Sequence, residues 1–205
     1  IVTLGTSSIF KGFMQGALNS KQLAVIPEGM SAFGKSALFV AENAQSGLTS
    51  RMPMAMLILL AVLALSWFVL RRTMYGRGLY AIGGNETAAE VAGINTSRMK
   101  IKIYMLAAIL YGLTGFLMVA KSGGASVNTA QSYELEAIAG CTIGGVSVNG
   151  GVGKISGILV GVLVFEILKI ALQFMGVESS YTYIAQGLVI IVAVAIDIRK
   201  YLAKK

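Results

Sequence analysis

The chain has 205 residues, of which 56% are hydrophobic and 13% are charged, whereas a soluble domain carries about a quarter charged residues. This composition predicts a polytopic membrane protein, and a formal charge of +8 gathered beside apolar runs is typical of cytoplasmic loops rather than of nucleic-acid binding. One cysteine and no histidine exclude an internal disulfide, a histidine base and the common kinds of metal site.

The first predicted element is a membrane helix over residues 1–18. The chain starts with Ile1 rather than an initiator methionine, and no signal peptide precedes the helix, so we expect a piece of a longer protein. Gly12 and Gly16 have the GxxxG spacing that lets two membrane helices approach closely. Lys11 either has a function at membrane depth or extends toward the interface, and the sequence leaves both interpretations open.

Residues 19–51 are mixed and polar, which predicts an external loop with one short amphipathic turn around residues 36–44. A second membrane helix is predicted over residues 53–70, an uncharged run that begins with Pro53, a favourable residue in a first helical turn. Trp67 falls near the cytoplasmic end of this helix, at the depth that tryptophan prefers.

Residues 75–102 are the one sizeable polar, charged and glycine-marked stretch between two uncharged apolar runs. Asn85 can cap a short helix that Gly93 ends. The small apolar face of this helix consists of Ala88, Ala89, Val91 and Ala92. The surrounding basic residues are Arg71, Arg72, Arg77, Arg98, Lys100 and Lys102. Such a segment predicts a docking surface for a second protein, and the alternative is an ordinary surface helix.

A third span is predicted over residues 101–120, followed by a polar external loop over 121–133. The next stretch, 134–148, is apolar only in part. It is interrupted by Gly140, Gly144 and Gly145. Short membrane helices broken by glycine expose backbone groups that can line a substrate pathway, but glycines also serve helix packing alone. Both interpretations stay open.

A helix over residues 154–174 is predicted to pack closely against a neighbour, because three glycines recur every four residues on one face. These glycines are Gly153, Gly157 and Gly161. Glu166 and Lys169 have the i, i+3 spacing of an ion pair, which favours a structural role over a place in a pathway.

A last span over residues 182–198 leads into a basic tail. The tail and the loop at 71–100 both carry the positive bias of a cytoplasmic segment, so an even number of crossings separates them. We therefore expect residues 134–148 to cross the membrane and Lys154 to lie near the cytoplasmic side.

Two blocks of this sequence resemble a known family. Residues 76–94 follow the pattern GR-x-x-x-A-I-G-G-N-x-x-A-A-x-x-x-G-I, and residues 133–161 read YELEAIAGCTIGGVSVNGGVGKISGILVG. Both blocks resemble the permease subunits of bacterial ABC importers for ribose, xylose and galactose or methyl galactoside. The resemblance extends over essentially the whole chain. The surroundings of Cys141 are most similar to the galactoside branch, whereas Glu166 and Lys169 depart from the small or neutral residues usual there.

The resemblance implies that residues 75–100 form a cytoplasmic coupling loop whose helix, 83–94, docks on a separate ATP-binding subunit. The coupling residues would be Gly83, Gly84, Asn85, Ala88, Ala89, Gly93 and Ile94. Gly83-Gly84 would act as a hinge, and Ala88-Ala89 would sit in a groove of the ATPase.

The other partners that the resemblance implies are a second permease copy, an external sugar-binding protein and the lipid bilayer, with no nucleic acid. The pathway would lie between two permease copies. Its candidate lining residues are Asn128, Gln131, Tyr133, Glu134, Thr142 and Ser147.

No nucleophile–base pair, metal-ligand set or phosphate-binding lysine motif can be assembled from the residues. We therefore expect a transport subunit without catalytic site, metal or cofactor, with ATP used by the partner. The predicted fold is an all-α polytopic transmembrane helical bundle of about six spans. It is a single permease domain over residues 1–205, the C-terminal part of a longer permease in the bacterial cytoplasmic membrane.

Three alternatives stay open. The first is an ion- or proton-coupled secondary carrier, for which Glu134, Glu136 and Glu166 are the acidic residues near the membrane. The second is an ABC permease for another small solute, since the sequence does not name the sugar. The third is a structural membrane subunit without a pathway.

Overall fold

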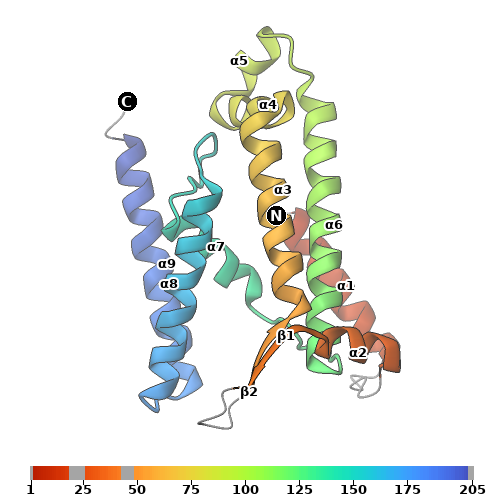
Figure 1. The fold of residues 1–205 in the computed structure, drawn as a ribbon. Helices are drawn as coiled ribbons and strands as arrows, with labels where there is room; N and C mark the ends of the chain where they lie inside the picture. The colour runs from red at the N-terminus through yellow and green to blue at the C-terminus, as the bar shows by residue number, and fades with distance from the viewer. Residues whose placement is uncertain (1, 19–25, 43–48, 203–205) are drawn as a thin grey trace. The chain divides into compact units, whose positions relative to one another are not determined.

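The computed structural model describes residues 2–18, 26–42 and 49–202 (Figure 1). It divides into two compact units. Unit 1 comprises Ile1–Val62 and Ile103–Ala130, and unit 2 comprises Leu63–Lys102 and Gln131–Lys205. Residue 1, parts of the predicted loop (19–25 and 43–48) and the end of the predicted basic tail (203–205) lie outside the described residues.

The described chain is mainly helical, as predicted. Its elements are α1 (Val2–Leu18), α2 (Glu28–Lys35), β1 (Ala37–Glu42), β2 (Thr49–Pro53), α3 (Met54–Arg72), α4 (Met74–Gly84), α5 (Glu86–Val91), α6 (Thr96–Ser122), α7 (Tyr133–Ile143), α8 (Ile155–Phe174) and α9 (Ser179–Leu202). Within the described ranges, α3, α6 and α8 are long and apolar enough to cross a membrane. The chain is therefore a helical membrane protein.

The predicted number of about six spans is not confirmed. The stretch predicted as 134–148 overlaps the 11-residue helix α7, which is about 16 Å long at 1.5 Å per residue. That is roughly half of a 30 Å hydrocarbon layer. The glycines and polar residues that follow Ile143 end the helix early, so the crossing predicted here would need the irregular residues 144–154 as well.

In unit 1, α2 packs against the end of α6. A side chain at Gly34 would collide with the backbone at Ala120, which is fully buried. The rings of Phe33 and Phe116 lie 5.8 Å apart between centroids. Glycine at position 34 therefore lets α2 lie directly on the α6 backbone.

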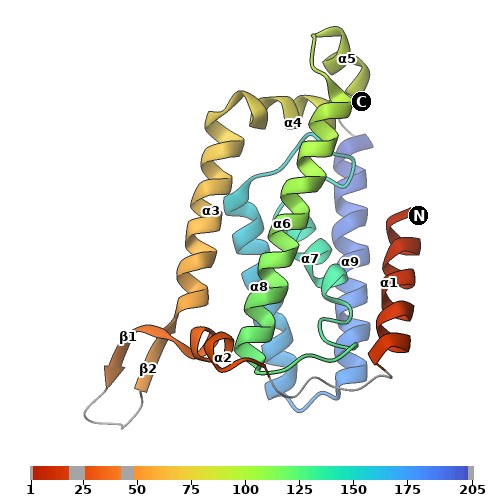
Figure 2. The same cartoon turned by 90° about the vertical axis from the view of Figure 1, so that its right-hand side faces the viewer.

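The structure corrects the prediction for residues 36–44. The short helix lies earlier, as α2, and residues 37–42 form β1, which pairs antiparallel with β2 (Figure 2). The Leu38-Phe39-Val40 run has high strand propensity, but its partner segment lies more than ten residues away. Local periodicity therefore does not reveal the strand pairing. Pro53 ends β2 rather than starting the helix, and α3 begins at Met54.

Helix α1 confirms the helix predicted over residues 1–18. Among the described residues, nothing lies within 4 Å of a side chain built at Gly12 or Gly16, so the predicted close approach of another helix stays a prediction. Lys11 is exposed.

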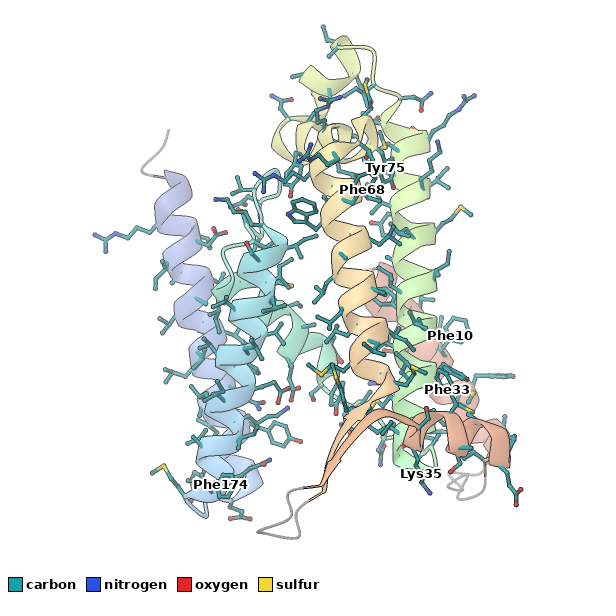
Figure 3. All side chains as sticks on the ribbon, in the orientation of Figure 1. Phe10, Phe33, Lys35, Phe68, Tyr75 and Phe174 are labelled. Atoms are coloured by element: carbon teal, nitrogen blue, oxygen red, sulfur yellow. The ribbon has the colours of Figure 1, made fainter. Side chains whose placement is uncertain are left out.

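Many apolar side chains stand out from the helices (Figure 3). Phe68 is 55% exposed and Phe174 is 87% exposed. Soluble proteins rarely expose apolar surface on this scale, whereas helices in lipid do. The exposure agrees with spans that contact lipid or further helices.

In unit 2, α7 packs against α8 and α9. Gly140 of α7 and Gly144, the C-cap of α7, meet Gly157 and Gly161 of α8 so closely that a Cβ at Gly144, Gly157 or Gly161 would collide with the facing backbone. The predicted packing role of Gly157 and Gly161 is confirmed. The glycines that interrupt residues 134–148 thus serve helix contact at positions 140 and 144, while Gly145 (φ +82°) closes the end of α7.

Candidate coupling site

The turn from α3 into α4 is tight and capped by Thr73. The Thr73 hydroxyl donates to the carbonyl of Val69 at 2.6 Å and accepts from the N–H of Gly76 at 3.2 Å. Gly76 is buried against the backbone of Leu70, where any side chain would collide. These contacts set α4 across the end of α3, as Figure 2 shows.

The polar segment contains two helices, where the sequence predicted one. Asn85 separates them, because its extended backbone (φ −159°) ends α4. Its side chain accepts a hydrogen bond from the N–H of Ala88 at 3.0 Å, which confirms it as the N-cap of α5.

Gly93 ends α5 as predicted. It has a left-handed backbone (φ +85°), and its N–H bonds to the carbonyl of Glu90 at 2.9 Å. The N–H of Ile94 bonds to the carbonyl of Ala89 at 3.0 Å. This pair of bonds is the Schellman arrangement that glycine favours. Asn95 then caps α6 by accepting from the N–H of Arg98 at 3.0 Å.

Two polar contacts fix α5 to the first turns of α6. Glu86 forms an ion pair with Lys100. The hydroxyl of Thr96, which is only 4% exposed, donates to a carboxylate oxygen of Glu90 at 2.6 Å. Neither pairing has the i, i+4 spacing of a single helix, so no local pattern in the sequence predicts them. The segment is therefore braced at both ends.

The exposed face of α5 differs from the predicted one. Ala89 is 3% exposed and faces the chain itself, whereas Val91 is 87% exposed and Ala88 is exposed as well. The prediction that Ala88 and Ala89 both present to a partner is thus corrected for Ala89. A helix of six residues has one side turned to its own protein, and Ala89 falls on that side.

Gly83 and Gly84, predicted as a hinge, form the last turn of α4. They lie against Gly150 and Gly151 in the connection between α7 and α8. A Cβ at Gly150 would lie 2.6 Å from the Gly83 oxygen, and one at Gly151 would lie 2.7 Å from the Gly84 Cα. Bending at this pair of residues stays a prediction, but the close contact of the two backbones explains glycine at positions 83, 150 and 151, whereas a Cβ at Gly84 would meet nothing within 4 Å.

A hydrogen bond adds to this backbone contact. The Tyr80 hydroxyl of α4 donates to the carbonyl of Gly153 at 3.0 Å. The same connection, residues 144–154, is also tied to α9, because Asp197 accepts from the Ser147 hydroxyl and from the N–H of Val148, both at 3.1 Å. Residues 144–154 therefore contact α4 on one side and α9 on the other.

The predicted pathway residues have different local surroundings, and their place in a pathway stays a prediction. Gln131, Tyr133 and Glu134 are exposed together at the start of α7. Thr142 is buried and its hydroxyl donates to the carbonyl of Ile138 at 2.7 Å, within its own helix. Ser147 is bonded to Asp197, as described above, and Asn128 belongs to unit 1.

A charged cluster joins α7 to α8. The Lys169 ammonium lies 3.1 Å from a carboxylate oxygen of Glu166, which confirms the predicted pair, and 3.0 Å from one of Glu136. The pairing with Glu136 was missed, because 33 residues separate the two positions and no local pattern marks them. The side chains of Lys169 and Glu136 are 19% and 18% exposed, so the cluster holds two helices together at a largely sheltered point.

Residues 1–194 match the family model described as "Branched-chain amino acid transport system / permease component". The chain belongs to this family. It is 37% identical over 208 residues to the galactose/methyl galactoside import permease protein MglC of Haemophilus influenzae, covering 100% of this chain and 60% of that protein.

Two further relatives match nearly the whole chain. The MglC protein of Escherichia coli is 34% identical over 205 residues, covering 100% of this chain and 58% of that protein. The ribose import permease protein RbsC of Bacillus subtilis is 34% identical over 200 residues, covering 98% of this chain and 59% of that protein. The chain thus spans about three fifths of the length of these relatives. No solved structure matches it.

Proposed function

We propose that this chain is the membrane-spanning permease part of an ABC importer for a monosaccharide, with ATP hydrolysed by a separate subunit. The names of its relatives support a sugar, since they are import permeases for galactose or methyl galactoside, ribose and fructose. The observation that carries the proposal is the braced helix α5, which presents Ala88 and Val91 outward from a segment with no catalytic groups of its own.

In this proposal α5 receives force from the ATPase without changing its own conformation. A helix of six residues is too short to be stable alone, so its shape depends on its caps and braces. Asn85 and Gly93 fix its two ends, and Glu86 and Glu90 tie it to α6. Ala88 and Val91 give a small apolar contact that fits a groove of the partner. Force applied there moves the segment as a rigid piece.

The movement would reach the membrane helices through residues 144–154. Because α4 contacts this connection through Gly83, Gly84 and Tyr80, a displacement of α4 shifts the segment that joins α7 to α8. The contact of Gly140 and Gly144 with α8 keeps these two helices together as they move. In this mechanism the chain transmits mechanical work and performs no chemistry, so it needs no cofactor or metal.

The pathway is proposed to lie between this chain and a second permease copy. An external sugar-binding protein would deliver the sugar to it. A neutral, hydroxyl-rich sugar needs a weakly binding polar lining, and the exposed residues at the start of α7 provide polar groups: Gln131, Tyr133 and Glu134. We place the protein in the bacterial cytoplasmic membrane. Six crossings follow if α1, α9 and the segment of α7 with residues 144–154 cross in addition to α3, α6 and α8.

A crosslinking experiment tests the proposal. Cysteine is introduced at Ala88 in the complete permease, with Cys141 replaced by serine, and the permease is co-expressed with its ATPase subunit. We expect a crosslink to the ATPase whose yield changes when ATP is added. Ala89→Cys is the matched control, since Ala89 is next to Ala88 but is buried in this chain, so a cysteine there should not react.

Two results decide the matter. A nucleotide-dependent crosslink from Ala88 alone supports docking of α5 and fixes its side of the membrane. Intact sugar uptake without any crosslink from Ala88 or Val91 contradicts the ABC mechanism and favours a secondary carrier. In that case uptake should also persist without ATP and stop when the proton gradient is collapsed.

A further inference from the structure

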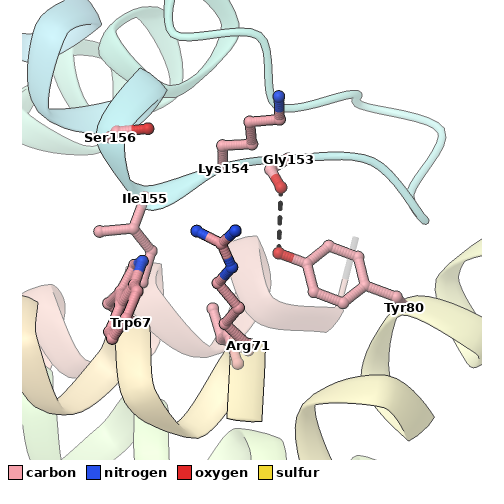
Figure 4. A pocket seen from close by; sticks show the side chains of 8 residues that line it. Trp67, Arg71, Tyr80, Gly153, Lys154, Ile155 and Ser156 are labelled. Carbon is pink, nitrogen blue, oxygen red and sulfur yellow. Dashed lines mark hydrogen bonds between the residues drawn. The ribbon is translucent and has the colours of Figure 1, made fainter.

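A pocket of about 530 Å³ lies in unit 2 where α3 ends and α8 begins (Figure 4). Its lining residues are Trp67, Leu70, Arg71, Tyr80, Gly153, Lys154, Ile155 and Ser156. In Figure 4 the Arg71 side chain points from α3 toward the backbone of residues 153–156. The guanidinium carbon of Arg71 is 5.6 Å from the ring centre of Trp67, a distance at which the ring helps to hold the cation in place.

The charge of this pocket is positive and unbalanced. Arg71 and Lys154 line it, and none of its lining residues is acidic. Among the described residues neither cation forms an ion pair, whereas Lys100 and Lys169 both do. Two cations in one pocket without a carboxylate repel each other, and an anion bound near both would offset this repulsion.

The backbone adds donors to the same place. Lys154 occupies the N-cap position of the 20-residue helix α8, and its side chain makes no capping bond. The first N–H groups of α8, beginning with Ile155 and Ser156, therefore point out of the helix without a side-chain cap. The positive end of the α8 dipole reinforces the two cations, and such helix ends accommodate phosphate. The Ser156 hydroxyl is a further polar group in the lining.

The position of the pocket at the ends of two apolar helices indicates what kind of ligand it can bind. Both α3 and α8 are long and apolar enough to span a membrane, and the pocket lies at the last turn of one and the first turn of the other. The boundary between the hydrocarbon and the headgroups falls at such helix ends. Trp67, with its apolar ring and polar N–H, is the residue type that settles at this boundary. The lining is apolar at Leu70 and Ile155, which suits the first carbons of an acyl chain or a glycerol backbone.

We propose that this pocket binds an anionic glycerophospholipid, with its phosphate held by Arg71, Lys154 and the N-terminus of α8. Basic pockets between membrane helices on the cytoplasmic side bind anionic headgroups in this way. The site is independent of the sugar and of the ATPase. It places a lipid beside Tyr80 and Gly153, at the contact between α4 and residues 144–154.

Trp67 offers a direct measurement, since it is the one tryptophan of the chain. The complete permease is purified in detergent, with any tryptophan outside this chain replaced, and titrated with brominated phosphatidylglycerol, whose bromine quenches a nearby indole. Brominated phosphatidylcholine serves as the neutral lipid. We expect phosphatidylglycerol to quench at a lower concentration than phosphatidylcholine.

The variants test the two cations. Arg71→Gln or Lys154→Gln should weaken phosphatidylglycerol binding about fivefold each, and the double variant about 25-fold, with binding of phosphatidylcholine unchanged. Arg72→Gln is the matched control, because Arg72 is the neighbouring cation at the same helix end and does not line the pocket. It should change binding less than twofold. Arg71→Lys keeps the charge and should retain most of the binding, which shows that the pocket survives substitution.

Three outcomes would overturn the proposal. The first is equal quenching by the two lipids. The second is an Arg71→Gln, Lys154→Gln variant that binds phosphatidylglycerol as well as Arg72→Gln does. The third is full displacement of the lipid by glycerol 3-phosphate at similar concentration, which would make the pocket a site for a soluble phosphate compound instead of a lipid.

Discussion

Replacing Tyr80 by phenylalanine should loosen the connection between ATP hydrolysis and transport. The Tyr80 hydroxyl donates to the carbonyl of Gly153 at 3.0 Å, and this bond links α4 to the segment that leads into α8. Phenylalanine keeps the ring and its packing and removes the donor alone. The backbone contact between Gly83 and Gly150 stays in place, so the variant tests the hydrogen bond separately from the fit of the two segments.

The size of the effect follows from the exposure of the bond. A net contribution of about 0.5–1.5 kcal/mol is usual for one hydrogen bond, and this one is exposed to solvent, so we take about 0.7 kcal/mol. That shifts the equilibrium between engaged and separated segments about threefold. If transport requires the engaged state and that state is at most half populated, sugar carried per ATP hydrolysed should fall about two- to threefold.

The assay measures both quantities in the same proteoliposomes, which contain the permease, the ATPase and the sugar-binding protein. Tyr75→Phe is the matched control, because Tyr75 lies on the same helix and its hydroxyl forms no hydrogen bond in the described structure. We expect ATP hydrolysis to persist in Tyr80→Phe while uptake drops. An unchanged ratio of uptake to hydrolysis, equal to that of Tyr75→Phe, would refute transmission through this bond. A proportional fall of both rates would place the defect at ATPase binding instead.

Two further variants test the packing of unit 2. Gly161→Ala should destabilise the permease by about 1–3 kcal/mol, because its Cβ would collide with the α7 backbone. Thermal unfolding of the purified protein measures this loss, and Gly187→Ala, at a position with open space, is the control. Equal stability of the two variants would contradict the close helix contact. Lys169→Met should destabilise more than Glu166→Gln, because it leaves the largely sheltered Glu136 without its partner, whereas Glu166 is 44% exposed. Equal unfolding temperatures for these two variants would show that the cluster does not hold α7 to α8.

Local signals in the sequence were sufficient for the ends of α5 and for the long apolar helices. Asn85 and Gly93 act through bonds to residues within five positions, so their roles can be predicted from the neighbouring sequence. The spacing of Gly157 and Gly161 likewise predicts a smooth face, although not which helix covers it. The coupling role of α5 stays a prediction, because a partner surface leaves no mark on the chain alone.

Contacts between distant residues could not be predicted in the same way. Tyr80 and Gly153 are 73 positions apart, and Glu136 and Lys169 are 33 apart, so no periodicity relates them. The burial of Ala89 depends on how α5 rests on the chain around it, and all of its small neighbours look alike in the sequence. The pairing of β1 with β2 was missed because strand pairing is decided by the partner segment as much as by intrinsic propensity.

The contact of Gly83 and Gly84 with Gly150 and Gly151 is made by main-chain atoms alone. Two such surfaces can roll or slide against each other without a change of rotamer, so a change of angle carries no side-chain entropy cost. In a contact made by interdigitated side chains, the side chains would have to change rotamer before the two segments could move. We therefore expect this junction to allow a change of angle during transport, and a side chain introduced at Gly83, Gly150 or Gly151 would collide with the facing backbone and oppose that change.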